Sequence, residues 1–178
     1  MRIKRLTIKN LGKHKQIDVE LGGSVIGLLG KNAAGKSTIL KLLHFLMTGY
    51  TPAKENQDSF IRRTDPEIEV APEWGSVEAE FSAHGAHCVL SRRLGHGSNR
   101  KLTIDDKTYT RADDIQAALT DIIGADKYAI DNAVFPAQGE LNNVLFGSQA
   151  DREELLVKML LLGHMQKVAD VAAGKIKM

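Results

Sequence analysis

The stretch GLLGKNAAGKST, residues 27–38, decides how this chain folds. It contains the pattern G-x-x-x-x-G-K-[ST], running from Gly30 through Gly35 and Lys36 to Ser37, which is typical of loops that bind nucleotide phosphates. Glycines allow backbone conformations in which successive N–H groups point into one concavity and bind phosphate oxygens. Lys36 would add positive charge beside the β- and γ-phosphates, and the Ser37 hydroxyl would be a ligand of Mg²⁺.

The flanks of this loop favour the same interpretation. Residues 24–30 form a short apolar run, which predicts a buried parallel strand. Residues 36–47 have helical periodicity, with Leu40, Leu43 and Met47 expected on one face. The N-terminus of that helix would then face the phosphates, where its dipole favours an anion. The alternative is an ordinary glycine-rich turn between a strand and a helix.

Composition limits the classes of function. The chain has 178 residues and a formal net charge of +2, so any surface for nucleic acid must be local. Aromatic residues make up 5% of the chain, which argues against a stacking platform for single strands. A single cysteine, Cys88, favours a reducing compartment. With no signal-peptide core and no apolar run near the ~20 residues of a membrane span, we expect a soluble intracellular protein.

The rest of the chain alternates strand and helix patterns. A helix is expected from Ala112 or Asp113, with Ile115, Leu119 and Ile122 or Ile123 on its apolar face. A polar connection with three prolines covers residues 48–75. The other expected elements are strands at 2–10 and 15–21, hairpins at 76–95 and 101–110, a buried strand at 129–138 and helices at 139–147 and 149–178.

The last of these helices carries a heptad-like pattern. Its apolar positions are spaced alternately by four and three residues over about three heptads, which favours a coiled coil. Gly163 interrupts the pattern, and a plain amphipathic helix is the alternative. The positions are Leu155, Met159, Leu162, Gln166, Ala169, Ala173 and Ile176.

One catalytic part is missing from the predicted site. A nucleoside triphosphatase needs a carboxylate behind the metal, usually at the end of an apolar strand, and a group that positions the attacking water. Asp105 follows a half-polar strand beside a turn, and Asp131 follows only two apolar residues. Neither fits the role, so the chain is expected to bind nucleotide while lacking one component of hydrolysis.

Two further clusters of residues each allow a functional and a purely structural interpretation. His84, His87 and Cys88 are close enough for a metal site, but neighbouring strand residues point to opposite faces and an ordinary strand is favoured. The basic pairs Arg92–Arg93 and Arg100–Lys101 flank a glycine-rich turn. They predict either a hairpin tip that contacts DNA phosphates or a solvated hairpin end.

Taken together, residues 3–21, 27–40 and 134–160 resemble the SMC-like ATPases of DNA double-strand-break repair, of which the SbcC type is nearest. In that family an N-terminal lobe carries the phosphate loop and a glutamine loop. A long antiparallel coiled coil and a C-terminal lobe with the signature motif and acidic strand follow. The resemblance implies an α/β fold, an ABC-type P-loop NTPase N-terminal lobe over residues 1–150 with an added antiparallel β-subdomain. Residues 151–178 would be a C-terminal coiled-coil root helix.

The resemblance also assigns site residues. Gln138 falls on the glutamine loop, a second Mg²⁺ contact that senses the attacking water. Glycine stands at position 12 where the family often has a phosphate-binding arginine, and Lys13 is the candidate for that role. Residues 59–63 match a segment that passes near the nucleotide base. The phosphate-loop positions are Gly30, Asn32, Ala33, Ala34, Gly35, Lys36, Ser37 and Thr38, with alanine at 33 where the family commonly has glycine.

The implied function is ATP binding with Mg²⁺, and ATP hydrolysis in the complete head, which places the protein in the cytoplasm at the nucleoid or in the nucleus. The implied partners are the C-terminal lobe, a second ATPase head, DNA and a metal-dependent nuclease at the coiled-coil base, with no membrane. Two alternatives remain open. One is a self-sufficient P-loop kinase with Arg92 and Arg93 as lid arginines, and the other is a nucleotide-gated binding module without turnover.

Overall fold

The structure is a computed structural model that describes residues 1–23, 25–50, 57–64, 70–124, 130 and 148–149. The chain divides into two compact units, Met1–Ala125 and Asp126–Met178, and all elements named below belong to the first. The strand expected at 129–138 and the helices expected at 139–147 and 149–178, with the coiled-coil root, lie outside the described residues apart from Ile130, Ser148 and Gln149. Among the described residues, no helix combines the length and apolar character needed to cross a lipid bilayer.

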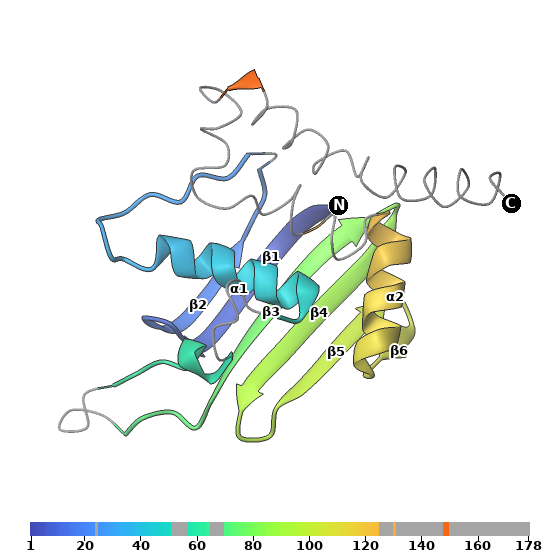
Figure 1. The fold of residues 1–178 in the computed structure, drawn as a ribbon. Coiled ribbons are helices and arrows are strands. Elements are labelled where there is room, and N and C mark those ends of the chain that lie inside the picture. Colours follow the sequence, from blue (N-terminus) through green and yellow to red (C-terminus); the bar gives the residue numbers. More distant parts are fainter. Residues whose placement is uncertain (24, 51–56, 65–69, 125–129, 131–147, 150–178) are drawn as a thin grey trace, which may run out of the picture. The chain divides into compact units, whose positions relative to one another are not determined.

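An antiparallel sheet of six strands organises the first unit, in the order β2-β1-β3-β4-β5-β6 (Figure 1). The turn between β3 and β4 is a tight pair, His84 (φ 48°) and Gly85 (φ 86°), as two-residue hairpins with type I′ geometry require. The strands are β1 (Arg2–Leu11), β2 (His14–Glu20), β3 (Trp74–Ala83), β4 (Ala86–Gly95), β5 (Asn99–Ile104) and β6 (Lys107–Tyr109).

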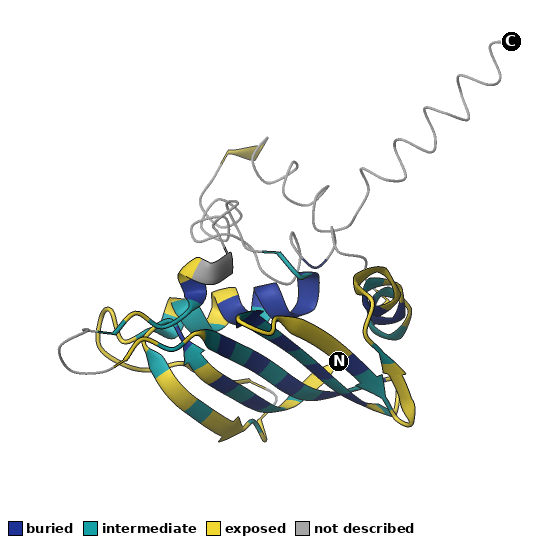
Figure 2. Ribbon diagram, turned by 90° about the horizontal axis from the view of Figure 1, so that it is seen from below, coloured by how far each residue is buried: buried dark blue, intermediate teal, exposed yellow. Residues whose placement is uncertain are grey.

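Strict alternation in β3 and β4 separates the two faces of the sheet. Val77, Ala79 and Phe81 of β3 are buried, and Phe81 pairs in register with the buried Cys88 of β4. Alternate residues of a strand point to opposite faces, so these side chains form one apolar face. The burial stripes across the sheet in Figure 2 follow this pattern.

Two helices cover that apolar face. Helix α1 (Lys36–Thr48) packs against β3 and β4, and helix α2 (Ala112–Ile123) packs against β5; both lie on the same side of the sheet in Figure 2. Full burial of a Leu, Ile or Phe side chain contributes about 1.5–3 kcal/mol, so these contacts form the core. The buried apolar residues are Leu42, Phe45, Leu46 and Met47 of α1 and Ile115, Ala118 and Leu119 of α2.

The predicted strands at the N-terminus, both hairpins and the helix from residue 112 are confirmed. The N-cap of α2 is Arg111 rather than Ala112 or Asp113. Of the apolar face predicted for α1, Met47 is confirmed as buried, whereas Leu40 is 51% exposed. The helix also buries Leu42, Phe45 and Leu46, which that prediction did not include.

The buried strand predicted at 24–30 is also wrong for the described residues. Residues 25–30 form no strand, and Leu29 is 96% exposed. A strand forms only where a partner supplies hydrogen bonds, and none of the six strands pairs with this segment. None of the described strands therefore buries this apolar run.

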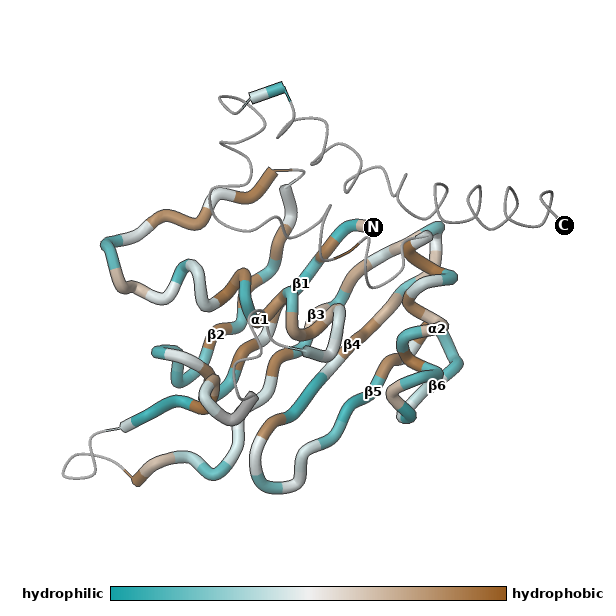
Figure 3. The backbone as a smooth tube through the Cα atoms, in the orientation of Figure 1, coloured by the Kyte–Doolittle hydropathy of each residue, from teal (hydrophilic) through white to brown (hydrophobic). Residues whose placement is uncertain are grey.

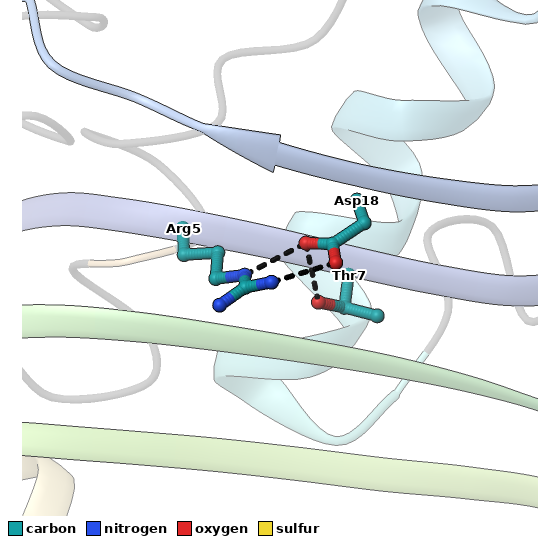
Figure 4. Close-up of polar contacts among 3 residues, drawn as sticks. All are labelled: Arg5, Thr7 and Asp18. Carbon is teal, nitrogen blue, oxygen red and sulfur yellow. Dashed lines mark hydrogen bonds and ion pairs between the residues drawn. The ribbon is translucent and has the colours of Figure 1, made fainter.

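The second face of the sheet is polar. Arg5 of β1 donates two hydrogen bonds of 2.7 Å to the carboxylate of Asp18 of β2, and the Thr7 hydroxyl donates to the same carboxylate at 3.4 Å (Figure 4). The hydrogen bond from Arg5 lowers the pKa of Asp18. These contacts connect the edge strand β2 to β1, but the pair is exposed, and such pairs are screened by water and salt.

Candidate nucleotide-binding site

The loop at residues 30–35 has the backbone that its glycines predict. Gly35 has φ 93°, in the left-handed region that favours glycine, and Ala33 has φ 63°. A non-glycine residue in this region is uncommon, so Ala33 adopts the turn at a small cost in strain. The Ala34 N–H donates to the Lys31 carbonyl at 3.2 Å and closes the turn. The replacement of the family's glycine by alanine is therefore compatible with the loop.

Helix α1 begins directly after this loop, and its N-terminus is open. The N-cap residue Gly35 has no side chain to accept a hydrogen bond from the first turn, and the first turn contains no acidic residue. The first four N–H groups of a helix lack intrahelical partners, and its dipole adds positive potential there. A phosphate group fits this end of α1 in both hydrogen bonding and charge.

The Lys36 ammonium lies over the loop. Its Nζ donates to the carbonyl oxygens of Gly30 and Lys31, both at 2.7 Å. These two bonds hold the cationic group against the first two residues of the loop. Ser37, the predicted metal ligand, is exposed next to it in the first turn of α1. The donor set, one ammonium, one hydroxyl and the helix N–H groups, fits a Mg²⁺-bound triphosphate.

The turn between β1 and β2 packs against this loop, which the sequence analysis did not predict. Gly12 has φ 60°, and a Cβ at that position would overlap the Thr38 methyl group. The His14 ring lies on Gly35: its Nε2 is 3.4 Å from the Gly35 carbonyl oxygen. The contacts join residues more than 20 positions apart, and no local pattern in the sequence indicates them.

A third segment also contacts the β1–β2 turn. The Gly12 N–H donates to the Phe60 carbonyl at 2.6 Å, and the Arg62 N–H donates to the Asn10 carbonyl at 2.9 Å. Phe60 ends the short 3₁₀ helix η2 (Gln57–Phe60). The structure thus brings part of the segment at 59–63 next to the turn that contacts the phosphate loop.

The structure brings most of the predicted site residues together. Lys13 is exposed at the turn between Gly12 and His14, both of which contact the phosphate-loop region. Gln138 lies outside the described residues. The remaining predicted residues are in the loop or the first turn of α1: Gly30, Asn32, Ala33, Ala34, Gly35, Lys36, Ser37 and Thr38.

The prediction that Arg92 belongs to a basic tip or a kinase lid is wrong. Arg92 is only 7% exposed on the helix-covered face of β4, in phase with Leu90 and Leu94. Its Nε donates to the Leu46 carbonyl at 2.7 Å, which satisfies the negative end of α1. Burial, followed by the charge of Arg100, lowers the pKa of Arg92 to about 10.

The neighbour Arg93 lies on the opposite face, with its guanidinium 4.3 Å from the centre of the Trp74 ring. Of the four predicted basic residues, Arg100 and Lys101 are exposed, on β5 just after the turn. A DNA contact at this hairpin would therefore depend mainly on these two residues.

The metal and carboxylate alternatives gain no support from the described residues. His87 and Cys88 are consecutive in β4, where Cys88 is buried and His87 is exposed. No group of three or more potential metal ligands occurs in the described part of the chain. Asp105 lies in the β5–β6 turn, where its side chain accepts the His87 N–H at 2.9 Å.

Comparison with known proteins gives consistent matches. The sequence model of one family, described as an AAA domain, matches residues 5–171. The chain is 25% identical over 172 residues to a DNA double-strand break repair Rad50 ATPase of Methanococcus maripaludis, covering 96% of this chain and 17% of the relative. For the Rad50 ATPase of Thermoplasma acidophilum the identity is 28% over 179 residues, covering 96% and 19%.

A solved structure shares the fold. It comes from work on the ATP-driven dimerization and DNA-stimulated activation of SMC ATPases, and it superimposes with a TM-score of 0.62 at 20% identity. The match covers 89% of this chain and 99% of that chain. The chain described above spans less than a fifth of the length of the two Rad50 relatives.

Proposed function

The chain belongs to this AAA-domain family of ATPases, and from that premise we propose that it is the ATP-binding N-terminal lobe of an SMC-like DNA double-strand-break-repair ATPase. The observation that carries the proposal is the phosphate loop followed by the open N-terminus of α1. Lys36, Ser37 and the loop N–H groups would hold the phosphates and Mg²⁺, with Lys13 and Gln138 as further contacts. Bound Mg²⁺ would neutralise charge on the phosphates.

An exposed apolar segment supports assembly with a C-terminal lobe. Between β2 and α1, the segment at 25–29 carries four apolar side chains, two of which, Val25 and Leu29, are more than 90% exposed. The tube between these two elements is partly brown in Figure 3, the colour of hydrophobic residues. Leu40 of α1 is half exposed as well. An apolar run of strand-forming residues that pairs with none of the described strands fits a sheet completed by another part of the ATPase. We propose the C-terminal lobe of the same ATPase as that partner.

Hydrolysis would then depend on groups that other lobes supply. The described residues provide no carboxylate at the end of a buried strand beside the loop. Transition-state charge in related reactions is often stabilised in trans, at a gain of roughly 10³–10⁵ in rate. A second ATPase head in the ATP-bound dimer would provide this element. Contact with DNA and with a metal-dependent nuclease would follow from that assembly, with Arg100 and Lys101 as candidate DNA contacts.

The test measures binding and turnover separately. This chain alone should bind Mg-ATP in calorimetry, release phosphate very slowly and stay monomeric by light scattering. Addition of a separately produced C-terminal lobe should restore hydrolysis and dimerisation together. Rapid hydrolysis by the chain alone, lost in Lys36→Ala, would show that the carboxylate lies within these residues. Binding without turnover even after addition of the lobe would indicate a nucleotide-gated module.

A further inference from the structure

One side chain at the end of the β1–β2 turn, that of His14, packs against the phosphate loop. The His14 imidazole occupies the space where a Cβ of Gly35 would lie, with Nε2 at 2.5 Å and Cε1 at 2.8 Å from that position. The same Nε2 is 3.4 Å from the Gly35 carbonyl oxygen. His14 is part-buried at the first residue of β2 and pairs in register with Leu11. The strand register therefore fixes the backbone position from which the ring extends.

Gly35 is the residue at which the loop becomes a helix. Its carbonyl oxygen accepts the Ile39 N–H at 3.1 Å, the first bond of α1. With the proton on Nε2, His14 donates to the same oxygen, which has two lone pairs. The ring also blocks the backbone of Gly35, which as glycine would otherwise have access to a wide range of conformations. Both effects restrict the backbone at the residue where the loop ends and α1 begins.

We propose that His14 is a positioning residue that holds Gly35, and with it the phosphate loop, in the conformation that accepts nucleotide. The effect of His14 on ATP binding rests on the proposed function. Its effect on the conformation of the loop does not. A loop that is already ordered loses less conformational entropy on binding. His14 would contact neither phosphate nor metal, and its effect would pass through Gly35 alone.

Three variants separate the steric effect of the ring from the effect of its hydrogen bond. His14→Ala removes both, His14→Phe keeps a ring without a donor, and His14→Gln keeps a donor near the position of Nε2. His96→Ala is the matched control, because His96 is exposed in the β4–β5 turn. Each protein is measured twice: by amide hydrogen exchange of residues 31–39 without nucleotide, and by calorimetric titration with Mg-ATP.

We expect His14→Ala to speed exchange at Ile39 and to weaken Mg-ATP binding, each by roughly three- to tenfold, the range for one hydrogen bond. His14→Gln should keep exchange and affinity close to the wild-type values, and His14→Phe should give intermediate values of both. If His14→Ala matches His96→Ala in exchange and affinity, the proposal is wrong. If the wild-type protein does not bind Mg-ATP but His14→Ala still speeds exchange, the proposed function is refuted. The role of His14 in ordering the loop then stands. Should His14→Ala fail to fold, the contrast between the Gln and Phe variants decides.

Discussion

Replacing Gly35 by alanine should destabilise the fold through two separable effects. The first is the backbone conformation, since φ 93° costs a residue with a Cβ about 1–2 kcal/mol. The second is steric, because the new methyl group would lie 2.5 Å from His14 Nε2 and would displace the ring. Forcing an added methyl group into a packed site typically costs about 1–3 kcal/mol. The free energy of unfolding should therefore fall by about 2–5 kcal/mol.

Gly85→Ala provides the matched control for the backbone effect. Gly85 has φ 86°, close to that of Gly35, but no described atom lies within 4 Å of its would-be Cβ. Its substitution should cost only the conformational part, about 1–2 kcal/mol. The difference between the two variants, measured by urea unfolding, isolates the contact with His14.

A double-mutant cycle completes this test. Removing the ring by His14→Ala should relieve the steric part of Gly35→Ala, so the double variant should be more stable than the sum of the single effects predicts, by about 1–3 kcal/mol. Additive effects of the two substitutions would refute the contact between His14 and Gly35. A Gly35→Ala cost no greater than that of Gly85→Ala would lead to the same conclusion.

Four further outcomes are expected. Lys36→Ala should abolish Mg-ATP binding in calorimetry while leaving the melting temperature nearly unchanged, because its ammonium bonds only exposed loop carbonyls; unchanged affinity would overturn the assignment of the loop. Arg92→Ala should lower the free energy of unfolding by about 2–3 kcal/mol, since a buried charged hydrogen bond to the end of α1 is lost, whereas Arg93→Ala on the opposite face should cost under about 1 kcal/mol. Leu29→Asp should leave the stability of this chain unaltered, as its side chain is 96% exposed, but should block co-purification with a C-terminal lobe; normal assembly would exclude the segment from that interface. The Cys88 thiol should react with a disulfide reagent only as the protein unfolds, because burial raises its pKa and shields it, and fast labelling of the native protein would contradict its position in the core.

Local patterns in the sequence were sufficient where the structure depends on local physics. The alternation through residues 76–83 and 86–95 fixed both strands of the central hairpin, and the glycine of the His84–Gly85 turn marked its position. The phosphate loop was equally predictable, since glycines and a following helix are sufficient to define it. In each case the determining contacts belong to one continuous turn or hairpin, in which every pair follows in register from the pair beside it.

The burial of Arg92 is predictable from the alternation of its strand. Cys88, Leu90 and Leu94 are apolar at alternate positions of one strand, and Arg92 has the same phase. Period-two alternation therefore places it on the covered face, although arginine is seldom buried. Its identity as arginine predicts a surface position, but its position in the strand places it on the buried face.

The remaining differences come from contacts between separate elements of the fold. The apolar run at 24–30 indicates a need for burial but not the partner that provides it. The contact between His14 and Gly35 joins positions 21 apart, and it depends on where the β1–β2 hairpin ends relative to α1. No local sequence pattern identifies the partner of this run or the contact between His14 and Gly35.

The two hairpin turns described above differ in how much added sequence they can accept. The β1–β2 turn is enclosed, with Thr38 against Gly12 and the His14 ring against Gly35. Lengthening it by even one residue would withdraw the imidazole from the loop. The space around Gly85 is open among the described atoms, and exposed hairpin tips of this kind tolerate insertions. A peptide tag or a fluorescent reporter should therefore be inserted between His84 and Gly85, where it would leave the nucleotide site undisturbed.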